Sequence, residues 1–148
     1  EGVAPGEPWV SIPISQYALL PVCPPKHPLA QKKDITLDIL LNEPLLLREP
    51  GSAIRDTFDS FLRLNHHKSQ PIMTSTNSQA LIASVAHGLG ISVLPDITVA
   101  DAIEKQLVST FSVKEMALTN ENSIVFHRNK IQPPAMKTFV SCALRQPF

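Results

Sequence analysis

Long apolar runs and clustered cysteines are both missing from this sequence of 148 residues. No stretch of about eighteen consecutive apolar residues occurs, so no helix is expected to span a membrane. The two cysteines, Cys23 and Cys142, lie far apart and predict neither a disulfide framework nor a zinc site. Residues 1–5 contain no basic and no long apolar stretch, unlike a signal peptide. We therefore expect a soluble protein located in the cytoplasm.

An excess of charge of either sign is also missing. The 13 lysines and arginines balance the 13 aspartates and glutamates, which gives a formal net charge of zero. Binding to a nucleic-acid backbone requires a basic face, so this segment is not expected to hold DNA or RNA by itself. Apolar residues make up 43% of the chain, which is enough to form a packed core.

Short apolar runs alternate with helical patterns along the chain. The patterns predict strands at 9–15, 17–23, 44–48, 71–74, 91–94, 107–113 and 123–127. They predict helices at 37–41, 53–64, 80–86, 98–105 and 134–144. Polar caps support this reading, with Thr36, Ser52 and Asn77 each preceding a helix. The alternation is typical of an α/β fold with mostly parallel sheets.

The strands and helices between about 44 and 113 are sufficient for one small lobe. The segments before and after them supply only three strands and one good helix, which is too little to close a second lobe. We predict that these flanking segments belong to a lobe whose earlier part lies upstream or on another chain.

Three segments resemble motifs of one known family, in that family's order and spacing. They are KHPLA with ITLD at 26–38, REPGSAIR at 48–55 and SQALIASVAHGLGISVLP at 78–95. The sequence resembles the effector-binding domain of LysR-type transcriptional regulators. The resemblance implies a two-lobed fold like the type 2 periplasmic binding proteins. It places lobe II at 43–119 and part of lobe I at 1–42 and 120–148, with the upstream portion of lobe I and the DNA-binding domain outside this chain.

The resemblance also implies a function. A small, anionic metabolite is expected to bind between the lobes and to change DNA binding by an attached winged helix-turn-helix, in a homodimer or tetramer. No catalytic residue, cofactor or metal is expected, because no nucleophile–base arrangement and no metal-ligand spacing is visible. Two alternatives stay open: a transport-type solute-binding protein and an enzyme on the same fold.

The candidate effector-binding residues follow predicted strands. Parallel strands place ligand groups at their carboxyl ends, and helix N-termini there favour an anion. Four consecutive polar residues make the strongest candidate, and the matching segment of the family contributes effector contacts. The candidates are Thr74, Ser75, Thr76, Asn77, Arg48, Ser52, Pro95 and Phe126. Alternatives are a plain helix cap for Ser52, an ion pair with Glu49 or Asp96 for Arg48, and core packing for Phe126.

The helix at 53–64 has a second expected role, because the resemblance implies that the family dimerises through it. The expected interface residues are Arg55, Phe58, Asp59, Leu62 and Arg63. The alternative is a solvated charged face with an inward apolar stripe. A peroxide-sensing role for Cys23 is a further alternative, which requires an exposed, activated thiol with a resolving partner nearby.

Overall fold

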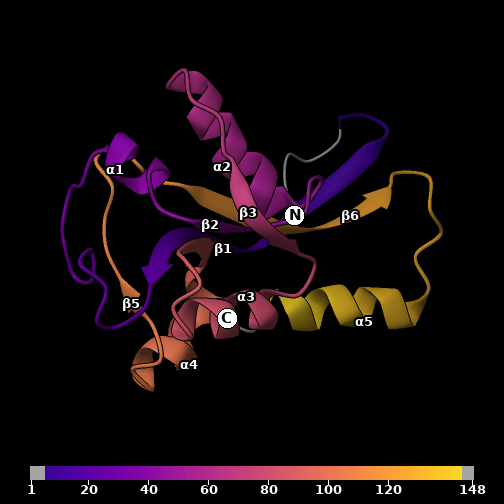
Figure 1. Cartoon of the computed structure of the whole chain (residues 1–148). Helices are drawn as coiled ribbons and strands as arrows, with labels where there is room; N and C mark the ends of the chain where they lie inside the picture. The colour runs from indigo at the N-terminus through magenta and orange to yellow at the C-terminus, as the bar shows by residue number, and fades with distance from the viewer. Residues whose placement is uncertain (1–5, 145–148) are drawn as a thin grey trace. The chain divides into compact units, whose positions relative to one another are not determined.

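The structure is a computed structural model that describes residues 6–144 (Figure 1). The chain divides into two compact units. The larger unit is Ala18–Thr119, and the smaller unit combines Glu1–Tyr17 with Asn120–Phe148. Strand β1 (Trp9–Cys23) runs through the boundary between them. No helix within the described residues is long and apolar enough to cross a membrane.

The larger unit is built around short strands. Strand β2 (Leu45–Arg48) pairs in parallel with β3 (Pro71–Ser75). On its other side β2 forms a parallel bridge from Leu45 to Ile91, just before β4 (Ser92–Pro95). Strand β4 pairs antiparallel with the end of β1, which also pairs antiparallel with β5 (Ser109–Thr110). β2, β3 and β4 therefore end at one edge.

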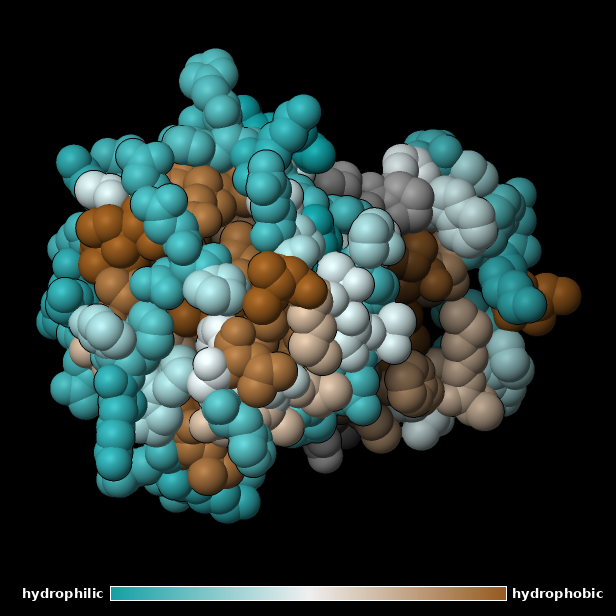
Figure 2. All heavy atoms as spheres, in the orientation of Figure 1, coloured by the Kyte–Doolittle hydropathy of each residue, from teal (hydrophilic) through white to brown (hydrophobic). Residues whose placement is uncertain are grey.

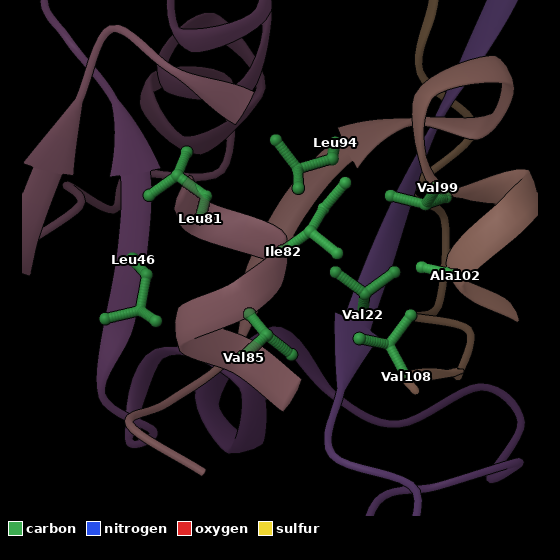
Figure 3. Packing of buried hydrophobic residues seen from close by; sticks show 9 residues of the cluster. All are labelled: Val22, Leu46, Leu81, Ile82, Val85, Leu94, Val99, Ala102 and Val108. Atoms are coloured by element: carbon green, nitrogen blue, oxygen red, sulfur yellow. The ribbon is translucent and has the colours of Figure 1, made fainter. Parts of the chain in front are cut away.

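Helices enclose these strands. Helix α1 (Leu37–Leu41) precedes β2, α2 (Ala53–Leu64) connects β2 to β3, α3 (Ser78–Ala86) connects β3 to β4, and α4 (Asp96–Glu104) follows β4. The main core cluster combines residues of β1, β2, α3, β4 and α4 with one residue that precedes β5. Its members are Val22, Leu46, Leu81, Ile82, Val85, Leu94, Val99, Ala102 and Val108 (Figure 3).

Local sequence explains where the helices begin and end. The Thr36 hydroxyl accepts a hydrogen bond from the backbone N–H of Ile39 at the start of α1. The Asn77 side chain accepts from two backbone N–H groups at the start of α3. Gly88 follows the end of α3 with a left-handed φ of +80°, as a C-terminal glycine is expected to do.

The smaller unit contains the first part of β1, strand β6 (Thr119–His127) from Asn120 onward and helix α5 (Pro134–Ala143). Strand β6 pairs with β1. The Asn120 side-chain amide donates to the Tyr17 hydroxyl at 3.1 Å, and the Asn122 amide donates to the Ser15 hydroxyl at 3.0 Å. No residue of α5 is buried. The predicted apolar stripe of this helix is therefore left without a cover inside the chain.

Several sequence predictions were wrong in detail. The strands expected at 9–15 and 17–23 are one continuous strand, which tolerates Pro13 at an exposed position. The expected strand at 107–113 is reduced to Ser109–Thr110. The pairings of β1 with β4 and β5 are antiparallel, so the larger unit is not mostly parallel. Pairing direction depends on residues far apart in the chain, which local patterns do not report.

The compact units differ from the predicted lobes at one boundary. Their second boundary falls between Thr119 and Asn120, where the prediction placed a crossover. The first falls after Tyr17, so residues 18–42 group with 43–119. The reason is that the end of β1 pairs with β4 and β5 of the larger unit. The assignment of lobes in the intact regulatory domain stays a prediction.

Candidate functional site

The carboxyl ends of β2, β3 and β4 bring most of the candidate effector-binding residues to one edge of the larger unit. The register of β2 and β3 places Arg48 opposite Ser75 and Leu47 opposite Thr74. The parallel bridge beside β2 carries the chain into β4, whose last residue is Pro95. Helices α2, α3 and α4 begin within a few residues of these strand ends. This arrangement is the one in which α/β sheets bind ligands.

Arg48 is held by two neighbours at this edge. Its Nε and Nη2 groups donate to the two carboxylate oxygens of Glu49 at 2.8 and 3.0 Å. Its Nη1 group donates to the Ser78 hydroxyl at 3.1 Å. Hydrogen bonds from Arg48 hold the pKa of the Glu49 carboxyl below its ordinary value. Of the two ion-pair partners considered for Arg48, Glu49 is therefore the one present in the structure.

The four polar residues at 74–77 divide into two pairs with different roles. The Asn77 side chain caps α3, and the Ser75 hydroxyl accepts from the backbone N–H of Asn77 at 3.1 Å. These two side chains therefore hold the turn in place. Thr74 and Thr76 are exposed, and neither hydroxyl has a hydrogen-bond partner among the described residues. Their hydroxyls are free to bind a ligand.

Ser52 occupies the N-cap position of α2, yet its hydroxyl makes no cap hydrogen bond. The sequence prediction of a position was correct, and the prediction of a plain side-chain cap was wrong. The backbone fixes the turn instead: the Ser52 N–H donates to the Glu49 carbonyl, and the Ser52 carbonyl accepts from the Asp56 N–H at 2.8 Å. The hydroxyl is thus not used to close the helix.

Pro95 and Phe126 fit the candidate site less well. Pro95 is buried, pairs with Leu19 of β1 and stands at the N-cap of α4. It therefore offers little surface to a ligand. Phe126 is half-buried in β6 and belongs to the smaller unit. Its contact with an effector stays a prediction.

Ser78 is a site residue that the sequence analysis missed. It is the first residue of α3, and its hydroxyl accepts the Arg48 Nη1 hydrogen bond. Serine directly after a capping residue is common at helix starts, so the sequence pattern alone carries no sign of this contact. The contact arises because β2 and β3 pair in register, which brings the start of α3 beside the end of β2.

Helix α2 presents fewer residues to a partner than the sequence suggested. Phe58 and Leu62 are 1% and 0% exposed, because they pack inside their own unit. A partner therefore has no access to these two side chains. Arg55 is also buried, whereas Asp59 is half-buried and Arg63 is exposed. A dimer interface on the outer face of α2 stays a prediction.

The two cysteines are free and differ in surroundings. Cys23 is buried and Cys142 is exposed. Burial, assisted by the negative charge of Glu43, raises the pKa of the Cys23 thiol from 9.0 to about 11. The thiolate form, which reacts with peroxide, is therefore strongly disfavoured at neutral pH. Cys23 lacks the activated thiol that a redox sensor needs.

We predict that an alkylating reagent at pH 8 labels Cys142 and spares Cys23. The physical reason is the combination of burial and a raised pKa at Cys23. Mass spectrometry of the native chain checks this, with chain unfolded in urea as the control that labels both. The same pKa difference lowers the stability of the fold as pH rises from about 9 to about 11, since only the unfolded thiol then ionises. Equal labelling rates at both thiols in the native chain would contradict the prediction.

The candidate site carries hydroxyls, one arginine and helix starts, and these bind an anion or a polyhydroxy compound without chemistry of their own. Within residues 6–144, no group of three or more histidine, cysteine or acidic residues is placed to hold a metal ion. The arrangement is that of a binding site.

Comparisons with known sequences agree with this reading. Residues 2–147 match the family described as "LysR substrate binding domain". The HTH-type transcriptional activator CmpR of Synechocystis is 30% identical over 115 residues, 78% of this chain and 38% of that protein. The HTH-type transcriptional regulator YeiE of Escherichia coli K12 is 31% identical over 134 residues, 90% of this chain and 44% of that protein. The chain thus spans about two fifths of these relatives.

Solved structures show the same fold. The CcmR regulatory domain of Synechocystis PCC6803, in complex with 2-PG, has a TM-score of 0.85 and 21% identity, with 95% of this chain and 69% of that chain covered. The effector-binding domain of QuiR, in complex with shikimate, has a TM-score of 0.81 and 21% identity, with 97% and 68% covered. The fold is that of LysR effector-binding domains, which is type 2 periplasmic-binding-protein-like. This chain belongs to the LysR substrate binding domain family.

Proposed function

We propose that this chain is the effector-sensing part of a LysR-type transcriptional regulator. It binds a small, anionic metabolite at the edge formed by the ends of β2, β3 and β4. The observation that carries this proposal is the pair of exposed, unpartnered hydroxyls of Thr74 and Thr76, beside a strand that ends in Arg48. The named relatives are transcriptional regulators, which supports sensing over catalysis.

An anionic ligand suits this edge for two reasons. Helices α2 and α3 begin there, and the positive end of a helix dipole stabilises negative charge. Arg48 supplies a guanidinium group that binds carboxylates in a planar geometry, in exchange for part of its pairing with Glu49. The ligands named with two structural neighbours, 2-PG and shikimate, are small molecules, and shikimate is a carboxylate.

The remaining parts of the regulator complete the proposal. Residues of the first lobe, Phe126 among them, supply the opposite wall of the site. Effector binding changes the relative population of two arrangements of the lobes, and this requires different affinities for the two. A winged helix-turn-helix outside these 148 residues contacts DNA, and the regulatory domains form a homodimer or tetramer in the cytoplasm.

The test is effector binding by the regulatory domain together with its upstream residues. A thermal-shift screen compares metabolites with and without a carboxylate, and a ligand at a hundred times its Kd is expected to add about 2.7 kcal/mol of stability. The double variant Thr74→Val, Thr76→Val removes both hydroxyls and keeps the side-chain shape. We expect its effector affinity to fall about tenfold, since each hydrogen bond contributes about 1 kcal/mol.

A matched control is Thr110→Val, which changes a strand threonine of the same unit outside the candidate site. It is expected to bind the effector as tightly as the unchanged chain. Effector binding that survives the Thr74 and Thr76 changes would move the site away from the end of β3. Failure of every carboxylate and phosphate compound would contradict the anionic class of ligand.

A further inference from the structure

A second basic pocket lies away from the strand-end site, along the outer face of α2. Its volume is about 240 Å³. It is lined by Arg55, Asp59, Arg63, His67, Lys68 and Ser69. Three of these residues are on α2, and the other three belong to the segment that returns from α2 to β3. In Figure 2 the free end of α2 is covered largely by hydrophilic residues.

One side of the pocket is a closed network that uses up its negative charge. The Arg55 Nε group donates to Asp59 at 2.7 Å, and Arg55 Nη2 donates to the Ser69 hydroxyl at 3.0 Å. The Ser69 hydroxyl donates in turn to the other Asp59 oxygen at 2.7 Å. Arg55 also donates to the Arg48 carbonyl, which ties the network to β2. The Asp59 carboxylate is therefore neutralised within the unit.

The other side of the pocket keeps positive charge without a counter-ion. Arg63 is exposed, and its printed contact is a neutral one, from Nη2 to the Ser60 hydroxyl at 2.8 Å. Lys68 is exposed and has no ion pair or hydrogen bond with the described residues. The pocket thus holds three fixed positive charges and one negative charge, an excess of two. This local excess stands out in a chain whose formal net charge is zero.

A wider hollow of about 460 Å³ adjoins this pocket and shares His67 and Lys68 with it. Its other lining residues are Asp38, Leu41, Asn42 and Gln70. The side chains there are mainly neutral hydrogen-bonding groups, which suit hydroxyls better than a second anion. The two hollows together have room for a charged head group and a polar body.

We propose that the pocket between α2 and residues 67–69 is a second ligand site, which binds the phosphate or sulfate group of a small molecule between Arg63 and Lys68. Arg63 offers a planar guanidinium group and Lys68 a mobile ammonium group, the two side chains that bind such oxyanions in proteins. The Arg55–Asp59–Ser69 network holds the floor of the pocket rigid. This site is independent of the effector site proposed at the ends of β2, β3 and β4.

The test is a titration of the ¹⁵N-labelled chain with inorganic phosphate at constant ionic strength, with chloride as the reference anion. We expect saturable shifts of the backbone amides of Lys68 and Ser69. The double variant Arg63→Gln, Lys68→Gln is expected to bind phosphate about tenfold more weakly, because it loses two charge-assisted hydrogen bonds. A phosphate monoester of a sugar, run in parallel, distinguishes the sources: tighter binding than inorganic phosphate assigns the site to a phosphorylated metabolite.

Two controls keep the outcomes separate. The double variant Lys105→Gln, Lys114→Gln removes the same charge from exposed positions elsewhere on the larger unit and is expected to bind phosphate normally. The variant Thr74→Val, Thr76→Val is also expected to keep phosphate binding, so failure of the effector proposal does not imitate failure of this one. Equal weakening in both lysine-containing double variants, or shifts that chloride reproduces, would overturn the proposal. So would a result in which the Arg63 and Lys68 changes alter only self-association in sedimentation measurements.

Discussion

Replacing Gly90 by alanine is expected to destabilise the larger unit by about 3 kcal/mol, the upper end of what overpacking costs. A β-carbon at this position overlaps the backbone carbonyl of Pro44. That carbonyl cannot move freely, because it accepts the Ile91 N–H hydrogen bond at 2.9 Å. The Leu46 N–H donates to the Ile91 carbonyl at 2.8 Å in the same bridge. The substitution therefore pushes β2 away from the segment leading into β4, at the framework of the candidate site.

Hydrogen exchange at the amides of Leu46 and Ile91 measures this effect directly. Both amides are expected to lose protection in the Gly90→Ala variant. Gly88→Ala is the matched control: a β-carbon there meets open space, but φ is +80°, so only backbone strain of about 1 kcal/mol is expected. A Gly90→Ala variant no less stable than Gly88→Ala would contradict the close approach seen in the structure.

Replacing Leu46 by alanine is expected to cost about 3 kcal/mol, within the range for buried leucines. Leu46 is 0% exposed and packs from β2 toward Leu81 and Val85 of α3 (Figure 3). Strand and helix are already fixed by other contacts, so the space left by the side chain cannot close completely. The loss acts on the β2–α3 packing that holds Arg48 near Ser78.

Urea unfolding followed by circular dichroism, with amide exchange in β2 and β4 as the local measure, checks this prediction. The matched control is Leu64→Ala, a leucine that is 81% exposed at the end of α2. Its change in stability is expected to stay within about 0.5 kcal/mol. If the two variants lose similar stability, the placement of Leu46 in the core is wrong.

Features that depend on neighbours in the chain were predictable from the sequence. The apolar residues of α2 recur at helical spacing, and Ile54, Phe58 and Leu62 are indeed buried. Thr36 and Asn77 cap the helices that follow them, as short polar side chains before an apolar pattern indicate. The family resemblance belongs to the same class, because its three motifs are runs of consecutive residues.

Features of the candidate site were only partly predictable. The sequence located the polar run at 74–77 after a strand, and the structure shows that Ser75 and Asn77 hold the turn while Thr74 and Thr76 stay free. The sequence also left the partner of Arg48 open. Which hydroxyl is free depends on backbone groups that face it after folding, and residue type alone does not report this.

By itself, then, the sequence determined the helices, their caps, the family and the strand ends that carry polar groups, since each of these is encoded by residues close together in the chain. Only the tertiary structure decided the antiparallel pairing of β1, the burial of Phe58 and Leu62 away from a partner, and the basic pocket beside Arg63 and Lys68. The physical reason is that pairing direction, burial and local charge balance depend on which distant segments meet. Such meetings are settled by the packing of the whole unit rather than by the preference of any one segment.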